Sequence, residues 1–130
     1  MDEPVFLSRE RVLQLHILSL QQHGGLAGLR EPGLFDSALM QPEATYHYGR
    51  GDLADIAAAY AFHIAQNQPF LDGNKRTAIT SALAFLELNG TSTSAITDAE
   101  LHDAMIGIAE KRVDKAGLAA IFRQCIRLAP

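Results

Sequence analysis

Midway along the chain, two apolar helical patterns are joined by Asn67-Gln68-Pro69-Phe70-Leu71-Asp72-Gly73-Asn74-Lys75-Arg76-Thr77. This segment places an acid, an amide and two adjacent cations around a glycine where a helix is expected to begin. The first turn of a helix has unpaired N–H groups and partial positive charge, so it attracts anions. Lys75 and Arg76 add two full charges, and the guanidinium can hold phosphate oxygens in a bidentate way. Gly73 lets a phosphate approach the backbone closely.

Asp72 is the residue that a bare anion site does not explain, because its carboxylate would repel the ligand. It fits if Mg²⁺ bridges it to phosphate oxygens, as this ion does with one carboxylate and a bound nucleotide. The segment therefore predicts a magnesium–nucleotide phosphate site. A structural interpretation is also open, in which Asp72 caps the helix and Lys75 and Arg76 are solvated. That interpretation leaves the two cations unexplained, since they oppose the helix dipole.

Helices are expected on both sides of this segment. Asp52 and Asp55 suit the N-cap and first turn of the preceding helix. The following helix is expected to run from near Gly73 to Asn89-Gly90, a typical left-handed ending. Towards the N-terminus, Ser8 suits the N-cap of a first helix that carries Val12, Leu13, Leu15, Ile17, Leu18 and Leu20 and ends at Gly24-Gly25.

The remaining segments complete a pattern of helices and short loops. A short helix is expected from Leu34 to Met40, ended by Pro42, with a loop from Glu43 to Gly51. Thr97 and Glu100 match a capping box, and Asp114 is expected to cap a last helix with Leu118, Ile121, Phe122, Cys125 and Ile126. We therefore predict an all-α fold of about six helices.

Length, composition and net charge limit the classes of protein to which this sequence can belong. The 130 residues suit a single domain, 1–130, and 48% hydrophobic with 20% charged residues is ordinary for a soluble globular protein. A net charge of -4 argues against direct nucleic-acid binding. The acidic N-terminus does not resemble a signal peptide, and no apolar run is long enough for a membrane span, so we expect a cytoplasmic protein. The one cysteine, Cys125, is expected to be a small buried hydrophobe.

The central segment resembles the signature of the Fic superfamily, His-Pro-Phe-x-Asp/Glu-Gly-Asn-Gly/Lys-Arg. Lys75, where adenylylating Fic enzymes carry glycine, is typical of the death-on-curing (Doc) branch. The resemblance extends from Leu7 to about Leu128 and includes His16 with Gly24-Gly25, the run from Gly28 to Leu39, and Phe85-Leu86 with Asn89-Gly90. Glu31 stands where aspartate is usual and keeps the charge.

This resemblance implies a toxin of a toxin–antitoxin pair that transfers the γ-phosphate of ATP to a threonine of elongation factor Tu, inhibiting translation. It implies that Asp72 holds Mg²⁺ and that Gly73, Asn74, Lys75 and Arg76 bind the nucleotide phosphates. The region of Tyr46 and Tyr48 would correspond to the one that clamps the target peptide. The chain has no autoinhibitory Ser/Thr-x-x-x-Glu-Gly/Asn pattern, so inhibition is expected in trans, from an antitoxin helix that covers an apolar groove.

Gln68 is the departure from the family signature, because it occupies the position of the catalytic histidine. An amide has no useful basicity near neutral pH, and losing a positioned base costs about 10²- to 10⁴-fold in rate. We therefore expect an impaired kinase-like transferase. Two alternatives stay open: nucleotidyl transfer, as in other Fic proteins, and a non-catalytic module that binds an antitoxin or a nucleotide.

The other histidines are not expected to replace the missing base. His63 is five residues upstream on a different helix face, and His63 and His16 are expected to be structural or half-buried. His47 and His102 form no recognisable constellation in the sequence.

Overall fold

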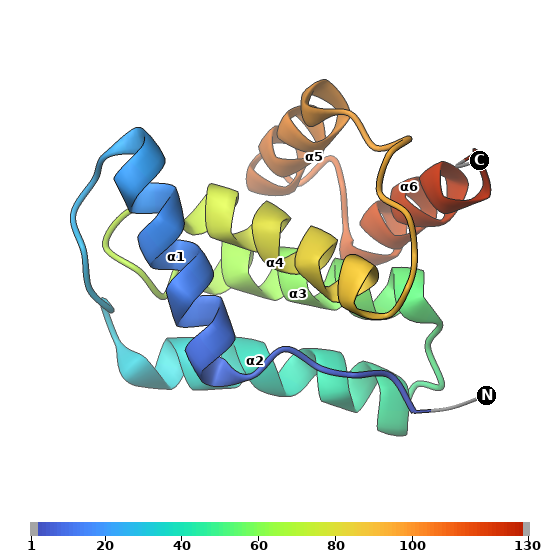
Figure 1. The fold of residues 1–130 in the computed structure, drawn as a ribbon, viewed down its shortest axis with the longest axis horizontal. Helices are drawn as coiled ribbons and strands as arrows, with labels where there is room; N and C mark the ends of the chain where they lie inside the picture. Colours follow the sequence, from blue (N-terminus) through green and yellow to red (C-terminus); the bar gives the residue numbers. More distant parts are fainter. Residues whose placement is uncertain (1–2, 129–130) are drawn as a thin grey trace.

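The computed structural model describes residues 3–128, which form six α-helices joined by short loops (Figure 1). The helices are α1 (Arg9–His23), α2 (Pro32–His47), α3 (Leu53–Asn67), α4 (Asn74–Leu88), α5 (Asp98–Ala109) and α6 (Lys115–Leu128). Within the described residues, the β pairing is limited to one antiparallel bridge between Leu29 and Phe70. The predicted all-α fold of about six helices is confirmed.

Helix α3 lies at the centre and packs against α2, α4, α5 and α6, while α1 crosses α4 (Figure 1). Eight of its 15 residues are buried, and five of these eight are alanines. A helix that is apolar on most sides belongs in the interior, and small side chains let neighbouring helices approach closely. The central position of α3 fixes the place of the loop that follows it.

The helix ends follow the predicted local signals. The side chains of Ser8, Asp52, Thr97 and Asp114 accept backbone N–H groups three residues further on, at 3.1, 2.9, 3.1 and 2.7 Å. Asp52 belongs to a capping box that starts α3. Helix α4 is followed by Gly90, whose φ of 80° is the left-handed conformation expected there.

Helix α2 is longer than the sequence predicts. It extends from Pro32 to His47 with Pro42 inside it, so the expectations that Pro42 ends this helix and that residues 43–47 form a loop are wrong. Pro42 cannot donate a hydrogen bond to the carbonyl of Ala38. Its ring is buried, however, and Tyr46 in the last turn packs against Phe6 with ring centroids 6.1 Å apart. Packing of this face offsets the lost hydrogen bond.

The apolar residues of α1 do not all point inward. Val12 and Leu15 are buried, whereas Ile17 and Leu18 are about half exposed, at 51% and 48%. Leu18 lies on the wall of a surface hollow described below. Among the described residues, no helix combines the length and the apolar character that a membrane crossing requires.

Candidate functional site

The segment between α3 and α4 contains two residues in the left-handed backbone conformation. Gln68 ends α3 with φ 47° and ψ 58°, and Gly73 starts α4 with φ 79° and ψ 17°. A left-handed conformation costs a residue with a side chain roughly 1–2 kcal/mol, so other contacts must hold Gln68 in place. At Gly73, an added Cβ would meet only ordinary contacts of 3.5–3.6 Å. The backbone conformation, rather than lack of space, therefore favours glycine at Gly73.

The loop between α1 and α2 lies beside this segment and pairs with its backbone (Figure 1). The N–H of Arg30 donates to the carbonyl of Pro69 at 2.7 Å, and the N–H of Leu71 donates to the carbonyl of Gly28 at 3.1 Å. These bonds form the antiparallel bridge between Leu29 and Phe70. The bridge ties this loop to the segment that joins α3 and α4.

Two side chains strengthen this connection. The guanidinium of Arg30 donates from Nε to the carbonyl of Gln68 and from Nη2 to the carbonyl of Asn67, both at 3.0 Å. In return, Nδ2 of Asn67 donates to the carbonyl of Leu34 at 3.0 Å. The end of α3 is thus bonded to the loop before α2 and to the first turn of α2.

His16 supports the loop from the side of α1. Its ring is buried and stacks on Phe70, with centroids 3.7 Å apart and an interplanar angle of 10°. Nε2 lies 2.7 Å from the carbonyl oxygen of Asp72, and because a carbonyl only accepts, Nε2 carries the proton. His16 is a structural residue, as expected.

Asn74 has its side chain committed to the loop. Its Oδ1 accepts the N–H of Phe70 and its Nδ2 donates to the carbonyl of Phe70, both at 2.9 Å. Each end of the amide therefore makes one bond to the loop. The backbone N–H of Asn74, in the first turn of α4, stays available for the predicted phosphate contact.

The first turn of α4 is open to a ligand. No side chain caps it, and the first backbone bond joins the N–H of Thr77 to the carbonyl of Gly73 at 3.0 Å. The N–H groups of residues 74–76 are consequently left without intrahelical partners. Lys75 and Arg76 are exposed, and neither forms a hydrogen bond or ion pair with another described residue. Three N–H groups and two cations are thus available to an anion.

Asp72 is half-buried beside this turn, and its Oδ2 accepts the N–H of Leu26 at 2.7 Å. A carboxylate has further lone pairs, so this bond leaves room for a cation. Across residues 3–128, no group of three or more His, Cys, Asp and Glu side chains is placed to hold a metal ion. These residues fit Mg²⁺ only in the mode that uses one carboxylate and nucleotide phosphates.

A pocket of about 640 Å³ unites these groups. It lies between the end of α3, the start of α4 and α5, and its volume suits a small-molecule ligand. The structure brings together all the site residues that the sequence predicted, because the pocket is lined by Gln68, Asp72, Gly73, Asn74, Lys75 and Arg76.

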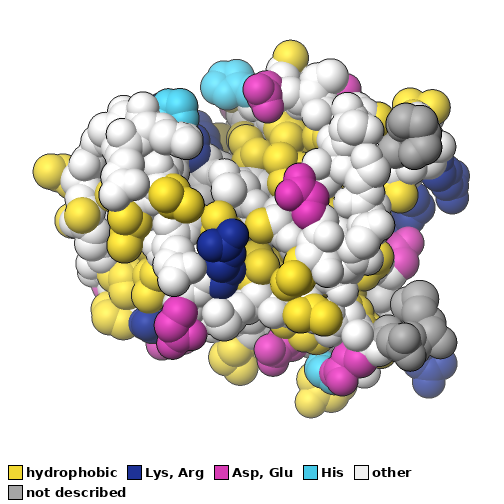
Figure 2. All heavy atoms as spheres, viewed as in Figure 1, with side chains coloured by type: hydrophobic (Ala, Val, Ile, Leu, Met, Phe, Trp, Pro, Cys, Tyr) yellow, Lys and Arg dark blue, Asp and Glu magenta, His cyan; other side chains and the backbone are white. Residues whose placement is uncertain are grey.

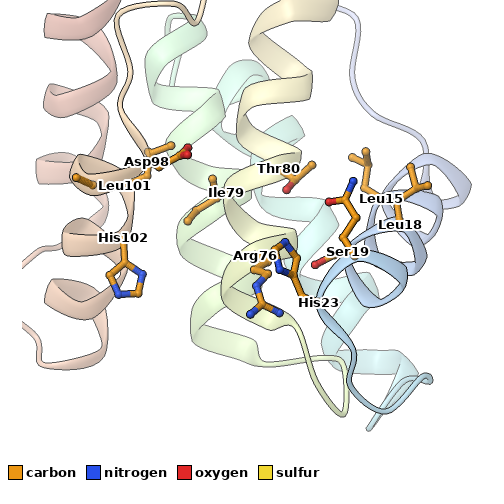
Figure 3. A pocket seen from close by; sticks show the side chains of 12 residues that line it. Leu15, Leu18, Ser19, His23, Arg76, Ile79, Thr80, Asp98, Leu101 and His102 are labelled. Atoms are coloured by element: carbon orange, nitrogen blue, oxygen red, sulfur yellow. The ribbon is translucent and has the colours of Figure 1, made fainter.

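A second hollow of about 650 Å³ adjoins the first, between α1, α4 and α5 (Figures 2 and 3). Figure 3 shows Arg76 of α4 between His23 of α1 and His102 of α5. Arg76 and His102 line both hollows. The wall of the second one is largely apolar, with Leu15, Leu18, Ile79 and Leu101. On the face shown in Figure 2, positive and negative side chains are interspersed.

His102 is a titratable pocket residue that sequence reasoning missed. It is exposed, it contacts the same pocket as Gln68, and no hydrogen bond or ion pair with a described residue occupies its ring. A signal was present, because Asp98, His102, Met105 and Ala109 are spaced by four, three and four residues and so share one helix face. Only the packing shows that this face lines the two hollows.

His63 is directed away from the pocket, as expected. Its Nε2 accepts a hydrogen bond from Nζ of Lys115 on α6, at 3.0 Å. Burial, with the neighbouring charge of Lys115, lowers the pKa of His63 to about 4. His63 is therefore neutral at physiological pH and engaged with another helix.

The region of Tyr46 and Tyr48 does not reach the pocket. Tyr46 and His47 belong to the last turn of α2, and Tyr48 follows it, 90% exposed. They lie near the start of α3, whereas the pocket lies at its end, about 20 Å away for a helix of this length (Figure 1). Neither tyrosine lines the pocket, and the expectation that this region clamps a target peptide stays a prediction.

Cys125 is buried, as expected. Burial and a hydrogen bond from its Sγ to the carboxylate of Glu100 raise the pKa of the thiol. A thiol that resists ionisation is a poor nucleophile. Cys125 is therefore a residue of the core and not a reactive thiol.

Known proteins resemble this chain over most of its length. The sequence profile of the Fic/DOC family matches residues 6–86. Protein kinase doc of Escherichia phage P1 is 32% identical over 119 residues, which cover 91% of this chain and 93% of that protein. Toxin Doc of Mycolicibacterium smegmatis (strain ATCC 700084 / mc(2)155) is 37% identical over 120 residues, which cover 88% of each chain.

Proposed function

The chain belongs to the Fic/DOC family, and on this premise we propose that it is the toxin of a toxin–antitoxin pair, acting as a protein kinase. It transfers the γ-phosphate of ATP to a hydroxyl of a protein, namely a threonine of elongation factor Tu, and so inhibits translation. The names of its relatives support a toxin and a kinase. We further propose that residues 1–130 act as one domain in the cytoplasm.

The observation that carries this proposal is the open first turn of α4, with its two uncommitted cations and the carboxylate of Asp72 in one pocket. The N–H groups of residues 74–76 and the side chains of Lys75 and Arg76 bind the phosphates. Asp72 would hold Mg²⁺, which supplies charge neutralisation at the transferring phosphate.

Gln68 lowers the rate of this reaction without abolishing it. In the transfer step, the hydroxyl oxygen bonds to the γ-phosphorus, and the bond to the β,γ-bridging oxygen breaks with its electron pair leaving on ADP. The hydroxyl proton must also leave, and because an amide cannot accept it, the proton passes to a phosphate oxygen or to water. Gln68 can still orient the hydroxyl by a hydrogen bond, and a loose transition state depends mainly on positioning.

The partner that inhibits this toxin is an antitoxin whose helix binds the second hollow. The apolar wall there, with Leu18 and Ile79, suits the apolar face of an amphipathic helix. Arg76 lines both hollows, so a helix in the second one would lie against a phosphate-binding residue. Inhibition in trans would follow from this shared side chain.

The experiment compares the chain carrying Gln68 with its Gln68→His form, using ATP labelled at the γ- or α-phosphate and purified elongation factor Tu. We expect the Gln68→His form to transfer γ-label about 10²- to 10⁴-fold faster than the Gln68 form and to arrest growth when expressed. A Gln68→His/Arg76→Ala form is the control, because it restores the base and removes a phosphate ligand.

The outcomes separate the alternatives. Transfer of α-label would replace kinase activity by nucleotidyl transfer. If no form transfers label, arrests growth or binds ATP with Mg²⁺, the chain is a non-catalytic binding module and the kinase proposal fails.

A further inference from the structure

We propose that Arg30 is the positioning residue for position 68, the place of the proton-accepting group in the reaction proposed above, on which this inference rests. Arg30 bonds to three consecutive carbonyl groups. Its backbone N–H reaches Pro69 at 2.7 Å, its Nε reaches Gln68 at 3.0 Å, and its Nη2 reaches Asn67 at 3.0 Å. One residue therefore holds the backbone immediately before, at and after the first motif position.

Charge favours this arrangement at the end of α3. The last turn of a helix has unpaired carbonyls and partial negative charge, which a nearby cation stabilises. Helix α3 has no basic residue in its own last turn. Arg30 supplies that cation from another part of the chain, 37 residues away in sequence from Asn67.

The bonds from Arg30 hold Gln68 in an unfavourable backbone conformation. Gln68 is left-handed, with φ 47°, and its side chain is exposed at the pocket. Without an external hold, the end of the helix would fray or Gln68 would relax toward a more favourable region of φ and ψ. Either change would turn its side chain relative to Lys75 and Arg76 across the same pocket.

Arg30 acts through the backbone and not on the ligand. It is exposed and does not line the pocket, whereas Gln68, Asp72, Lys75 and Arg76 all do. Its loss should consequently reduce the rate of phosphate transfer more than the affinity for ATP. A displacement of about 1 Å at a reacting group can cost about 10²-fold in rate.

The experiment uses the Gln68→His form of the full chain as the parent, since its rate is easier to measure. Arg30→Met removes both guanidinium bonds, and Arg30→Lys keeps the charge but cannot reach both carbonyls in a bidentate way. Arg112→Met is the matched control, because Arg112 donates from the same two atoms, Nε and Nη2, to Glu110 in a loop beyond α5. For each form we would measure kcat, the Kd of ATP with Mg²⁺, and the thermal midpoint.

We expect Arg30→Met to lower kcat about 10- to 100-fold while the Kd changes by less than about twofold. Arg30→Lys should recover part of this loss, and Arg112→Met should leave kcat and Kd unchanged. A change in kcat below about twofold for Arg30→Met would overturn the role of Arg30. The proposed function would survive, because the parent would still transfer phosphate.

Equal loss of kcat and of ATP binding, with a matching loss of folded protein, would also overturn it, since Arg30 would then be only structural. If the parent itself transfers no phosphate, the proposed function fails and the role of Arg30 falls with it.

Discussion

The side chains of Phe70 and Asn74 contact other parts of the protein, by stacking and by hydrogen bonds. A few residues away, the side chains of Gln68, Lys75 and Arg76 are exposed and form no bond with another described residue. We call the first pair the scaffold residues and the other three the pocket residues, although the scaffold residue Asn74 also lines the pocket. A sequence motif presents all five as parts of one signature. The structure separates them into residues that shape the loop and residues that are free for a ligand.

This difference explains how a short loop can keep two residues in the left-handed conformation. His16, Arg30 and the scaffold residues hold two left-handed turns in place before any ligand arrives. In the proposed function, the backbone of the pocket residues would then need little reorganisation to bind phosphate, and such preorganisation supplies much of the catalytic effect of a polar site. The following predictions test the separation, beginning with the largest effect.

Phe70→Ala should destabilise the protein by about 3–5 kcal/mol, because it removes a buried ring from the core. Phe70 is 2% exposed, stacks on His16 and lies 5.3 Å from the ring of Phe35. Urea unfolding measures the change. A loss of less than about 1 kcal/mol would show that Phe70 does not anchor the loop.

Arg76→Ala should have the opposite profile. The loss of a charge-assisted contact to phosphate weakens ATP–Mg²⁺ binding by about 1.5–3 kcal/mol, or about 10- to 150-fold. Stability should stay within about 0.5 kcal/mol, because Arg76 is exposed and makes no hydrogen bond to a described residue. Calorimetric titration and urea unfolding give the two values, and an equal loss in both would contradict the separation.

Asn74→Ala tests the boundary between the two sets. Removing its two bonds to Phe70 should cost about 1–2 kcal/mol of stability and leave the Kd of ATP within about twofold. Asn74→Asp is the companion variant, since it keeps the acceptor for the N–H of Phe70. If affinity falls and stability does not, the side chain itself is a phosphate ligand and Asn74 belongs with the pocket residues.

His102→Asn should reduce ATP affinity by about 0.5–1.5 kcal/mol, a typical value for one hydrogen bond. His102 contacts the pocket from α5 and has no partner among the described residues. His23→Asn is a suitable control, because His23 lines only the second hollow. Unchanged affinity for His102→Asn would limit the nucleotide site to the α3–α4 segment.

The pH dependence of stability should come partly from His63, which belongs to neither set. Its folded pKa of about 4 lies below the usual 6.5, so the unfolded chain binds more protons between these values. The contribution of His63 to the free energy of unfolding is therefore full above about pH 6.5 and is lost as the pH falls towards 4. His63→Asn should reduce the slope of the unfolding free energy against pH in that window. An unchanged slope would contradict the lowered pKa of His63.

The local signals of the chain were sufficient for most of the fold. N-caps such as Asp52 and terminators such as Gly90 act within a few residues, so their effect can be read without knowledge of the partner helices. The charges and glycine of the central segment likewise indicated an anion site at the start of α4.

Three features depended on contacts between distant parts of the chain. Pro42 is tolerated inside α2 because neighbouring elements bury it, and Arg30 reaches the end of α3 across 37 and 38 residues of sequence. His102 joins the pocket because α5 packs against α3. Local propensity cannot contain this information, since each feature depends on which surfaces become adjacent when the helices pack and on the burial and hydrogen bonds that this packing creates.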